Sequence, residues 1–96
     1  MSKVTVVARM QAKPGMEAAL KEQLLHMVKE TRKEAGCINY DLHCAADDPG
    51  KFLFYENWVS KAHLDAHAKS AHIQSFRARS GEYLAAPTEI TLWTML

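Results

Sequence analysis

The sequence predicts an α+β domain with a ferredoxin-like β-α-β-β-α-β order of elements and an antiparallel sheet. Two segments have apolar residues spaced by three and four, as in helices, and four segments are β-branched or alternate. Turns that contain Gly or Pro separate several of these segments. The chain has 96 residues, of which 48% are hydrophobic, which suffices for one modest core. Residues 1–96 are therefore predicted to form a single domain.

The first strand and the first helix are predicted for the N-terminal third of the chain. Residues 3–10 read KVTVVARM, a β-branched run that predicts a strand. The segment KPG at 13–15 ends this strand, and a helix follows it. The apolar stripe of this helix comprises Met16, Leu20, Leu24, Met27, Val28, Thr31 and Ala35. Gly36 is predicted to close the helix in the left-handed conformation.

The next two strands are predicted to form a hairpin. Residues 37–44 read CINYDLHC, with alternating apolar positions, and residues 51–59 read KFLFYENWV. Between them, AADDPG at 45–50 has the composition of a turn. One face of the hairpin carries three aromatic residues and a carboxylate, namely Tyr40, Phe54, Glu56 and Trp58.

The second helix is predicted to be broken in two. Ser60 is a good N-cap, and Ser70 resembles a second N-cap that restarts the helix. The stripe beyond the break comprises Ile73, Phe76, Ser80 and either Tyr83 or Leu84. Pro87 ends this helical region, and EITLWTML at 89–96 predicts the last strand.

The sheet face that the helices leave uncovered is predicted to be an interface. In a ferredoxin-like fold both helical segments cover the same face of the sheet. Yet the other face is also apolar, because it carries Leu53, Tyr55 and Val59. In the strand segments VTVVA and ITLW, the residues that point to either face are apolar. Because an exposed apolar patch of that size marks an interaction site, we expect a homodimer formed sheet face to sheet face.

Composition and charge argue against several kinds of binding partner and indicate the cellular location that is expected. A formal net charge of +1 argues against nucleic acid and anionic membranes, and no apolar run reaches the roughly 18 residues of a membrane span. The start, MSKVTVVARM, lacks a signal-peptide core, so a cytoplasmic location is expected. Cys37 and Cys44 would lie about 23 Å apart on one strand, too far for a disulfide, which suits a reducing compartment.

Three of the five histidines, His63, His67 and His72, lie within HLDAHAKSAH at 63–72. A metal site is one interpretation, because His63 and His67 have the i,i+4 spacing of the helical HExxH zinc motif. That motif needs a glutamate directly after its first histidine, where this chain has Leu64. A zinc site also needs three or four ligands. The sequence therefore predicts no metal site.

Two other interpretations of the histidines stay open. A solvated or packed side chain suits three of them: His26, His43 and His63. Acid–base chemistry is the other, because His67 and His72 would lie over the aromatic hairpin face and imidazole titrates near neutrality. His72 would be about the second residue of its helix, where the helix dipole disfavours the charged form. Glu56 is either a partner that orients a histidine or a carboxylate that reaches the sheet edge.

The stretches GCINYDLH, FLFYENW and SKAHLDAHAKSAH, with KPG before the first helix, resemble the antibiotic biosynthesis monooxygenase family. The quinol-monooxygenase-like branch is the most similar, and the resemblance covers Val4 to Leu92. It implies a ferredoxin-like protomer with a pocket between helices and sheet. It also implies a dimer whose two sheets form a dimeric α+β barrel.

Members of that family oxygenate quinols, anthrols or similar polycyclic phenols without metal or flavin. The resemblance therefore implies a cofactor-independent monooxygenase that takes a small aromatic substrate and dioxygen. The family's tryptophan at the end of the third strand matches Trp58, which becomes a pocket wall, and its two histidines match His67 and His72. The candidate catalytic residues are thus His67, His72 and Glu56, while Trp58, Tyr40, Phe54 and Phe76 would stack on the substrate.

The resemblance leaves other functions open. Relatives that isomerise a phosphorylated sugar share the two histidines, and three cationic side chains nearby could bind an anion: Lys69, Arg77 and Arg79. An isomerase or other proton-transfer enzyme, or a non-catalytic dimer that binds a small ligand, are the alternatives. Heme-degrading relatives also share the fold and Trp58. In this chain, the position of their heme-ligating histidine corresponds to a residue near Arg77. The position of their first-strand asparagine is occupied by Ala8 or Arg9.

Overall fold

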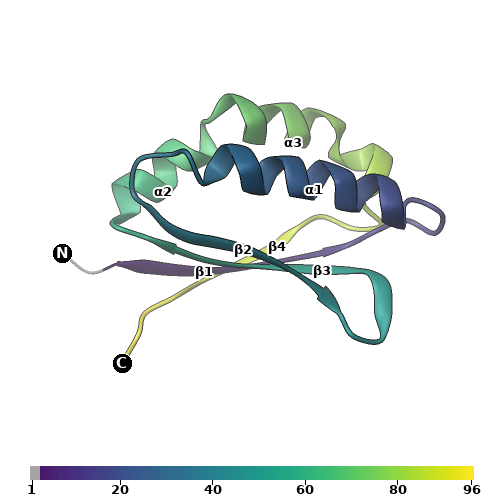
Figure 1. Cartoon of the computed structure of the whole chain (residues 1–96), viewed down its shortest axis with the longest axis horizontal. Coiled ribbons are helices and arrows are strands. Elements are labelled where there is room, and N and C mark those ends of the chain that lie inside the picture. The colour runs from purple at the N-terminus through teal and green to yellow at the C-terminus, as the bar shows by residue number, and fades with distance from the viewer. Residues whose placement is uncertain (1–2) are drawn as a thin grey trace.

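A computed structural model describes residues 3–96 of the chain (Figure 1). Its elements in order are β1 (Val4–Gln11), α1 (Glu17–Thr31), β2 (Cys37–Ala45), β3 (Asp48–Trp58), α2 (Lys61–Ala68), α3 (Ala71–Tyr83) and β4 (Glu89–Trp93). The predicted order of elements is confirmed, and the second helix is divided into α2 and α3 as expected. The fold is α+β with an antiparallel sheet, the predicted class.

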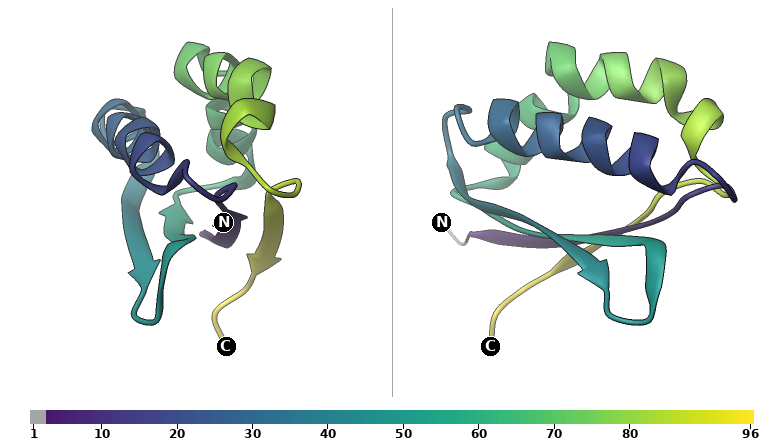
Figure 2. Two further views of the ribbon diagram at one scale, coloured as in Figure 1. Left: turned by 90° about the vertical axis from the view of Figure 1, so that its right-hand side faces the viewer. Right: turned by 45° about the vertical axis from the view of Figure 1, so that its right-hand side comes forward.

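The sheet has the strand order β2-β3-β1-β4, so β3 and β1 are its central strands. Glu56 on β3 lies opposite Tyr40 on β2 and Val6 on β1. All three helices lie on one side of the sheet, and Figure 2 shows α1 and α3 side by side above it. The alternation of each strand therefore sends one set of side chains toward the helices.

The hydrophobic core fills the space between the helices and this face of the sheet. The strands contribute Val6, Ala8, Met10, Tyr40, Phe52, Phe54 and Trp58, and the helices contribute Leu20, Leu24, Met27, Val28, Ile73 and Tyr83. The strand residues recur at every second position and the helix residues at every third or fourth position, as the sequence predicts. The aromatic hairpin face that the sequence predicts is therefore the buried face.

Helix α1 ends at Thr31, four residues before the predicted end at Ala35. The amide of Lys33 donates to the Glu30 carbonyl and that of Glu34 to the Thr31 carbonyl, so the chain tightens into three-residue turns. Gly36, with φ of +81°, then takes the left-handed conformation that the sequence predicts. The early end of α1 removes Glu34 from the helix and places it in the turn beside α2 and α3.

The junction of α2 and α3 positions two histidines. Ser60 caps α2 as predicted, because its hydroxyl accepts a hydrogen bond from the His63 amide. Ser70 precedes α3, but its side chain caps nothing: the hydroxyl donates to the His67 carbonyl at 2.7 Å. This bond stabilises the turn, with His67 before it and His72, the second residue of α3, just after it.

The far face of the sheet carries no helix in the described part of the chain (Figures 1 and 2). Tyr55 and Trp93, which belong to this face by strand register, are 41% and 55% exposed, and neighbouring Val59 is 49% exposed. Within residues 3–96, no helix has the length and apolar character needed to cross a bilayer.

Candidate functional site

A cavity of about 290 Å³ lies between the sheet and the pair α2–α3. This volume is at the lower end of the range for small-molecule sites. The lining consists of Val6, Ala8, Met10, Met27, Tyr40, Phe54, Glu56, Lys61, Leu64, Asp65, His67, Ala68, Ile73, Phe76, Arg77, Ser80, Thr88, Ile90 and Leu92. Because most of these side chains are apolar, the cavity suits a ligand with an apolar ring or chain.

His67, near the end of α2, is the imidazole that borders this cavity. Only 7% of the residue is exposed. Its ring packs on the Trp58 ring with centroids 4.6 Å apart and meets the Tyr40 ring edge-on at 5.5 Å. These two aromatic side chains, from β3 and β2, hold the imidazole in one orientation.

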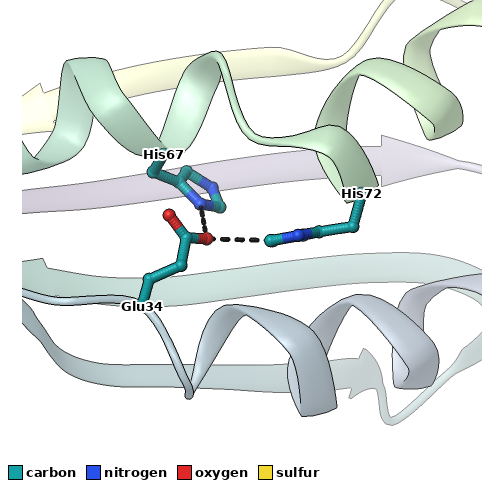
Figure 3. Close-up of side chains that lie close together, drawn as sticks. All are labelled: Glu34, His67 and His72. Atoms are coloured by element: carbon teal, nitrogen blue, oxygen red, sulfur yellow. Dashed lines mark hydrogen bonds and ion pairs between the residues drawn. The ribbon is translucent and has the colours of Figure 1, made fainter.

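Glu34 joins His67 to His72 (Figure 3). One carboxylate oxygen, Oε2, lies 2.7 Å from Nδ1 of His67 and 2.9 Å from Nε2 of His72. A carboxylate only accepts hydrogen bonds, so both ring nitrogens carry a hydrogen. Nε2 of His72 also lies 3.1 Å from the Thr31 hydroxyl and 3.3 Å from that of Ser70. The turn after α1 is thereby tied to both α2 and α3.

With its hydrogen on Nδ1, the neutral His67 ring has a free lone pair on Nε2. Figure 3 shows Nε2 on the side of the ring away from Glu34. Within residues 3–96, no group forms a hydrogen bond with Nε2. Every fully buried side-chain nitrogen or oxygen in that range has a hydrogen-bond partner, so Nε2 is not fully buried. Nε2 is therefore accessible, and the space next to the His67 side chain is the cavity that this residue lines.

The electrostatics of the site favour the neutral imidazole. The pKa of His67 is lowered, chiefly by burial and further by the charges of His72 and Arg77, although the hydrogen bond and charge of Glu34 act in the opposite direction. Near pH 7 the ring is therefore a proton acceptor. A buried, neutral histidine that a carboxylate orients can act as a general base toward a hydroxyl group in the cavity.

Glu56 lies on the sheet side of the cavity and is a second titratable group there. It is 4% exposed, and its Oε1 accepts a hydrogen bond from the Trp58 indole at 2.9 Å. Burial raises the pKa of Glu56 to about 7, against the lowering effect of that hydrogen bond. Near neutral pH part of the population is protonated, so this carboxyl group can donate a hydrogen bond into the cavity.

The structure places the predicted site residues in two groups. Those that line the cavity are Tyr40, Phe54, Glu56, His67 and Phe76. Trp58 and His72 lie outside the lining: Trp58 is fully buried behind His67, and His72 faces Glu34. Glu56 bonds the Trp58 indole, and no hydrogen bond joins it to a histidine within residues 3–96.

Glu34 and Thr31 are the site residues that sequence reasoning missed. The apolar periodicity predicts a helix that extends to Ala35, with Glu34 on its polar face and Thr31 in its apolar stripe. A glutamate two residues before a predicted left-handed glycine, Gly36, was the available indication, because helix ends often lie near such a residue.

The charged residues at the cavity lie where it meets solvent. Lys61 and Asp65 form an exposed ion pair, with nitrogen and oxygen 2.6 Å apart. Arg77 is exposed and has no carboxylate within 4 Å in the described part of the chain. Its guanidinium is therefore available to an anionic group on a ligand.

This chain is similar to known proteins in both sequence and structure. The family model described as antibiotic biosynthesis monooxygenase matches residues 3–79. The Mycobacterium tuberculosis protein named "Putative monooxygenase Rv0793" is 38% identical over 91 residues, which are 95% of this chain and 89% of that protein. The Escherichia coli protein named "Probable quinol monooxygenase YgiN" is 31% identical over 83 residues, 76% of this chain and 80% of its own.

Solved structures of related proteins share the fold of this chain. The structure of PA3566 from Pseudomonas aeruginosa superposes with a TM-score of 0.94 at 31% identity, covering 100% of this chain and 96% of that one. The structure of Rv0793 superposes with a TM-score of 0.92, covering 99% and 96%. The layer of helices and the sheet are thus shared over almost the whole length of each chain.

Proposed function

Because the chain belongs to the antibiotic biosynthesis monooxygenase family, we propose that it is a cofactor-independent monooxygenase that oxidises a quinol-like or polycyclic phenol with dioxygen. One observation carries this proposal: Glu34 holds Nδ1 of His67, no partner within residues 3–96 hydrogen-bonds its Nε2, and His67 lines an apolar cavity. The name of the Escherichia coli relative, "Probable quinol monooxygenase YgiN", supports the substrate class.

The proposed reaction begins with transfer of the phenolic proton to Nε2 of His67. The phenolate then gives one electron to dioxygen, and the resulting aromatic radical and superoxide combine to form a carbon–oxygen bond. This coupling gives a peroxide anion, to which His67 returns its proton. The ring carbon of the resulting hydroperoxide then gives its own proton to Nε2 of His67 as the O–O bond breaks, so that a carbonyl remains and hydroxide leaves. The proton held by His67 converts the hydroxide to water. One oxygen atom thus enters the product and the other becomes water.

The cavity supplies orientation and exclusion of water. Tyr40 and Phe54 stack on each other with ring centroids 4.4 Å apart, and Phe76 lines the helical side of the cavity. Between such surfaces a flat aromatic substrate is positioned and desolvated, which raises the reactivity of its phenolate. Trp58 acts indirectly, because it packs on His67 and hydrogen-bonds Glu56.

Glu34 is proposed as a positioning residue that fixes the His67 tautomer. We expect Glu34→Gln to lower kcat/KM by roughly 10²-fold, because an amide no longer secures the hydrogen on Nδ1. Glu30→Gln, in the last turn of α1, is the control and should leave kcat/KM unchanged. Nitrogen-15 spectra of the histidine rings provide the second readout. A His67 tautomer unchanged in Glu34→Gln would contradict the assigned role.

Oxygen consumption tests the proposed activity itself. An oxygen electrode with a panel of reduced quinones, with chelator present throughout, should show uptake well above autoxidation. Uptake at the background rate with every member of the panel would contradict the proposal.

The second candidate function is isomerisation of a phosphorylated metabolite. Arg77 favours it, because this guanidinium at the cavity has no carboxylate partner in the described part of the chain. His67 and Glu56, which both line the cavity, could then move a proton between two carbon or oxygen atoms. Proton exchange from such a metabolite without oxygen uptake would establish this alternative.

The exposed sheet face supports a homodimer as part of the proposal. No helix or strand within residues 3–96 covers Trp93 and Tyr55 on this face, and large exposed aromatic side chains mark interfaces. We expect Trp93→Lys to convert a sedimenting dimer to a monomer, because it places a charge in the buried interface. Lys21→Glu, on the exposed side of α1, is the control. A wild-type chain that sediments as a monomer at micromolar concentration would contradict the dimer.

A further inference from the structure

We propose that Glu34, His67 and His72 form a binding site for a divalent transition-metal ion of the zinc class, and that the bound ion inhibits the enzyme. One carboxylate oxygen and two imidazole nitrogens converge, all within 4.8 Å of one another. The inhibitory part of this inference rests on the proposed function of His67. The binding part does not.

The donor set selects the class of ion. Two imidazoles and one carboxylate are the ligands of many zinc sites and of other first-row transition-metal sites. Magnesium and calcium prefer oxygen ligands and are poor occupants of such a site. The Thr31 hydroxyl, 3.1 Å from Nε2 of His72, or a water molecule could supply a fourth ligand.

Contacts with neighbouring residues hold the three ligand side chains in place. The side chains of Glu34, His67 and His72 are 18%, 8% and 14% exposed, so the site is enclosed but not sealed. Trp58 packs on the His67 ring, and Ser70 bonds the His67 carbonyl. Such supporting contacts orient metal ligands and strengthen binding.

The distances require a small adjustment. Ligand atoms around a tetrahedral zinc ion lie roughly 3.4 Å apart, since each bond is about 2.0–2.2 Å long. Oε2 of Glu34 lies 2.7 and 2.9 Å from the two ring nitrogens, so the carboxylate must withdraw by roughly 0.5 to 0.7 Å. The two ring nitrogens, which lie within 4.8 Å of each other, must also come to about 3.4 Å apart. Glu34 lies in a turn between α1 and β2 rather than within a helix, which allows this movement.

Metal binding and proton acceptance by His67 exclude each other. An ion on Nδ1 uses the lone pair of that nitrogen, so the hydrogen of the neutral ring moves to Nε2. Nε2 is the ring nitrogen that Glu34 does not bind, and it is the atom proposed to take the substrate proton. With a hydrogen already there, His67 cannot act as the base, and the bound ion therefore stops turnover.

Calorimetric titration of the full chain with zinc chloride tests the binding part. We expect one ion per chain, with affinity reduced by at least about 100-fold in Glu34→Gln and in His72→Gln. His26→Ala, which removes an exposed histidine, is the control and should bind zinc as the wild type does. Magnesium chloride should give no binding heat. Equal zinc affinity in the wild type and both triad variants would overturn the proposal.

Nitrogen-15 spectra of the histidine rings test the geometry without relying on activity. Zinc should shift Nδ1 of His67 and Nε2 of His72 and move the His67 hydrogen to Nε2. Shifts confined to His26, His43 or His63 would contradict the assigned ligands. These spectra also serve if a variant folds poorly, because they need only the wild-type chain.

Oxygen uptake at saturating zinc tests the inhibitory part. We expect the rate to fall at least about tenfold, in step with the calorimetric saturation, and to return on addition of chelator. Undiminished or increased uptake with the site filled would overturn inhibition. If the metal-free chain shows no oxygen uptake with any phenol, the proposed function fails. Calorimetry and spectra would still decide the metal site.

Discussion

Replacing His67 with alanine should reduce kcat/KM for a phenolic substrate by roughly 10² to 10⁴-fold, the usual effect of losing a general base. The structure offers no second imidazole at the cavity within residues 3–96, because His72 faces Glu34. Steady-state oxygen uptake measures the change. The loss should appear in kcat rather than KM, since the stacking surfaces of Tyr40 and Phe54 remain.

The matched control is His26→Ala, which removes an exposed imidazole on α1 and should leave both constants unchanged. His67→Gln is a second variant, because an amide can keep a hydrogen bond to Glu34 but cannot accept the substrate proton at neutral pH. Activity near the wild-type level in His67→Gln would contradict the role of His67 as base.

Replacing Glu56 with glutamine should remove a large pH dependence of stability. The folded state raises the pKa of Glu56 from 4.5 to about 7 by burial, so the folded chain retains a proton that the unfolded chain releases. The free energy of unfolding therefore falls as the pH rises from about 4.5 through about 7. A shift of this size is worth about 3 kcal/mol, most of which is lost by pH 7 and nearly all of it by about pH 8.

Urea unfolding of the wild type and Glu56→Gln at pH 5 and pH 8, at one protein concentration, measures this effect. The variant does not titrate at this position, and it keeps an oxygen that accepts the Trp58 hydrogen bond. Its stability relative to the wild type should rise by about 3 kcal/mol between the two pH values. Glu22→Gln, at an exposed position on α1, should show no such rise. A constant difference between Glu56→Gln and wild type would show that Glu56 is ionised throughout.

The sequence predicted the sheet and its buried face because strand parity is a strong constraint. Tyr40, Phe54, Glu56 and Trp58 share a parity, and one face of each strand must turn toward the helices. Parity does not show which side chains the helices place on that face. The burial of Trp58 behind His67 depends on packing between α2 and β3, which no local pattern encodes.

The candidate site was less predictable than the fold because its residues come from separate elements. His67 and His72 were found from their proximity in the sequence, but Glu34 lies 33 residues before His67. Its role depends on the end of α1 at Thr31, and the apolar periodicity continues smoothly to Ala35. Helix ends are less well determined by periodicity than helix interiors, since three-residue turns compete there.

The most direct test of the central claim is turnover under ¹⁸O-labelled dioxygen with a reduced quinone or polycyclic phenol, followed by mass spectrometry of the product. A monooxygenase of the proposed mechanism places one labelled atom in the product and the other in water, and His67→Ala lowers the yield of labelled product. Unlabelled product formed without oxygen uptake, in the wild type and the variant alike, would contradict the account.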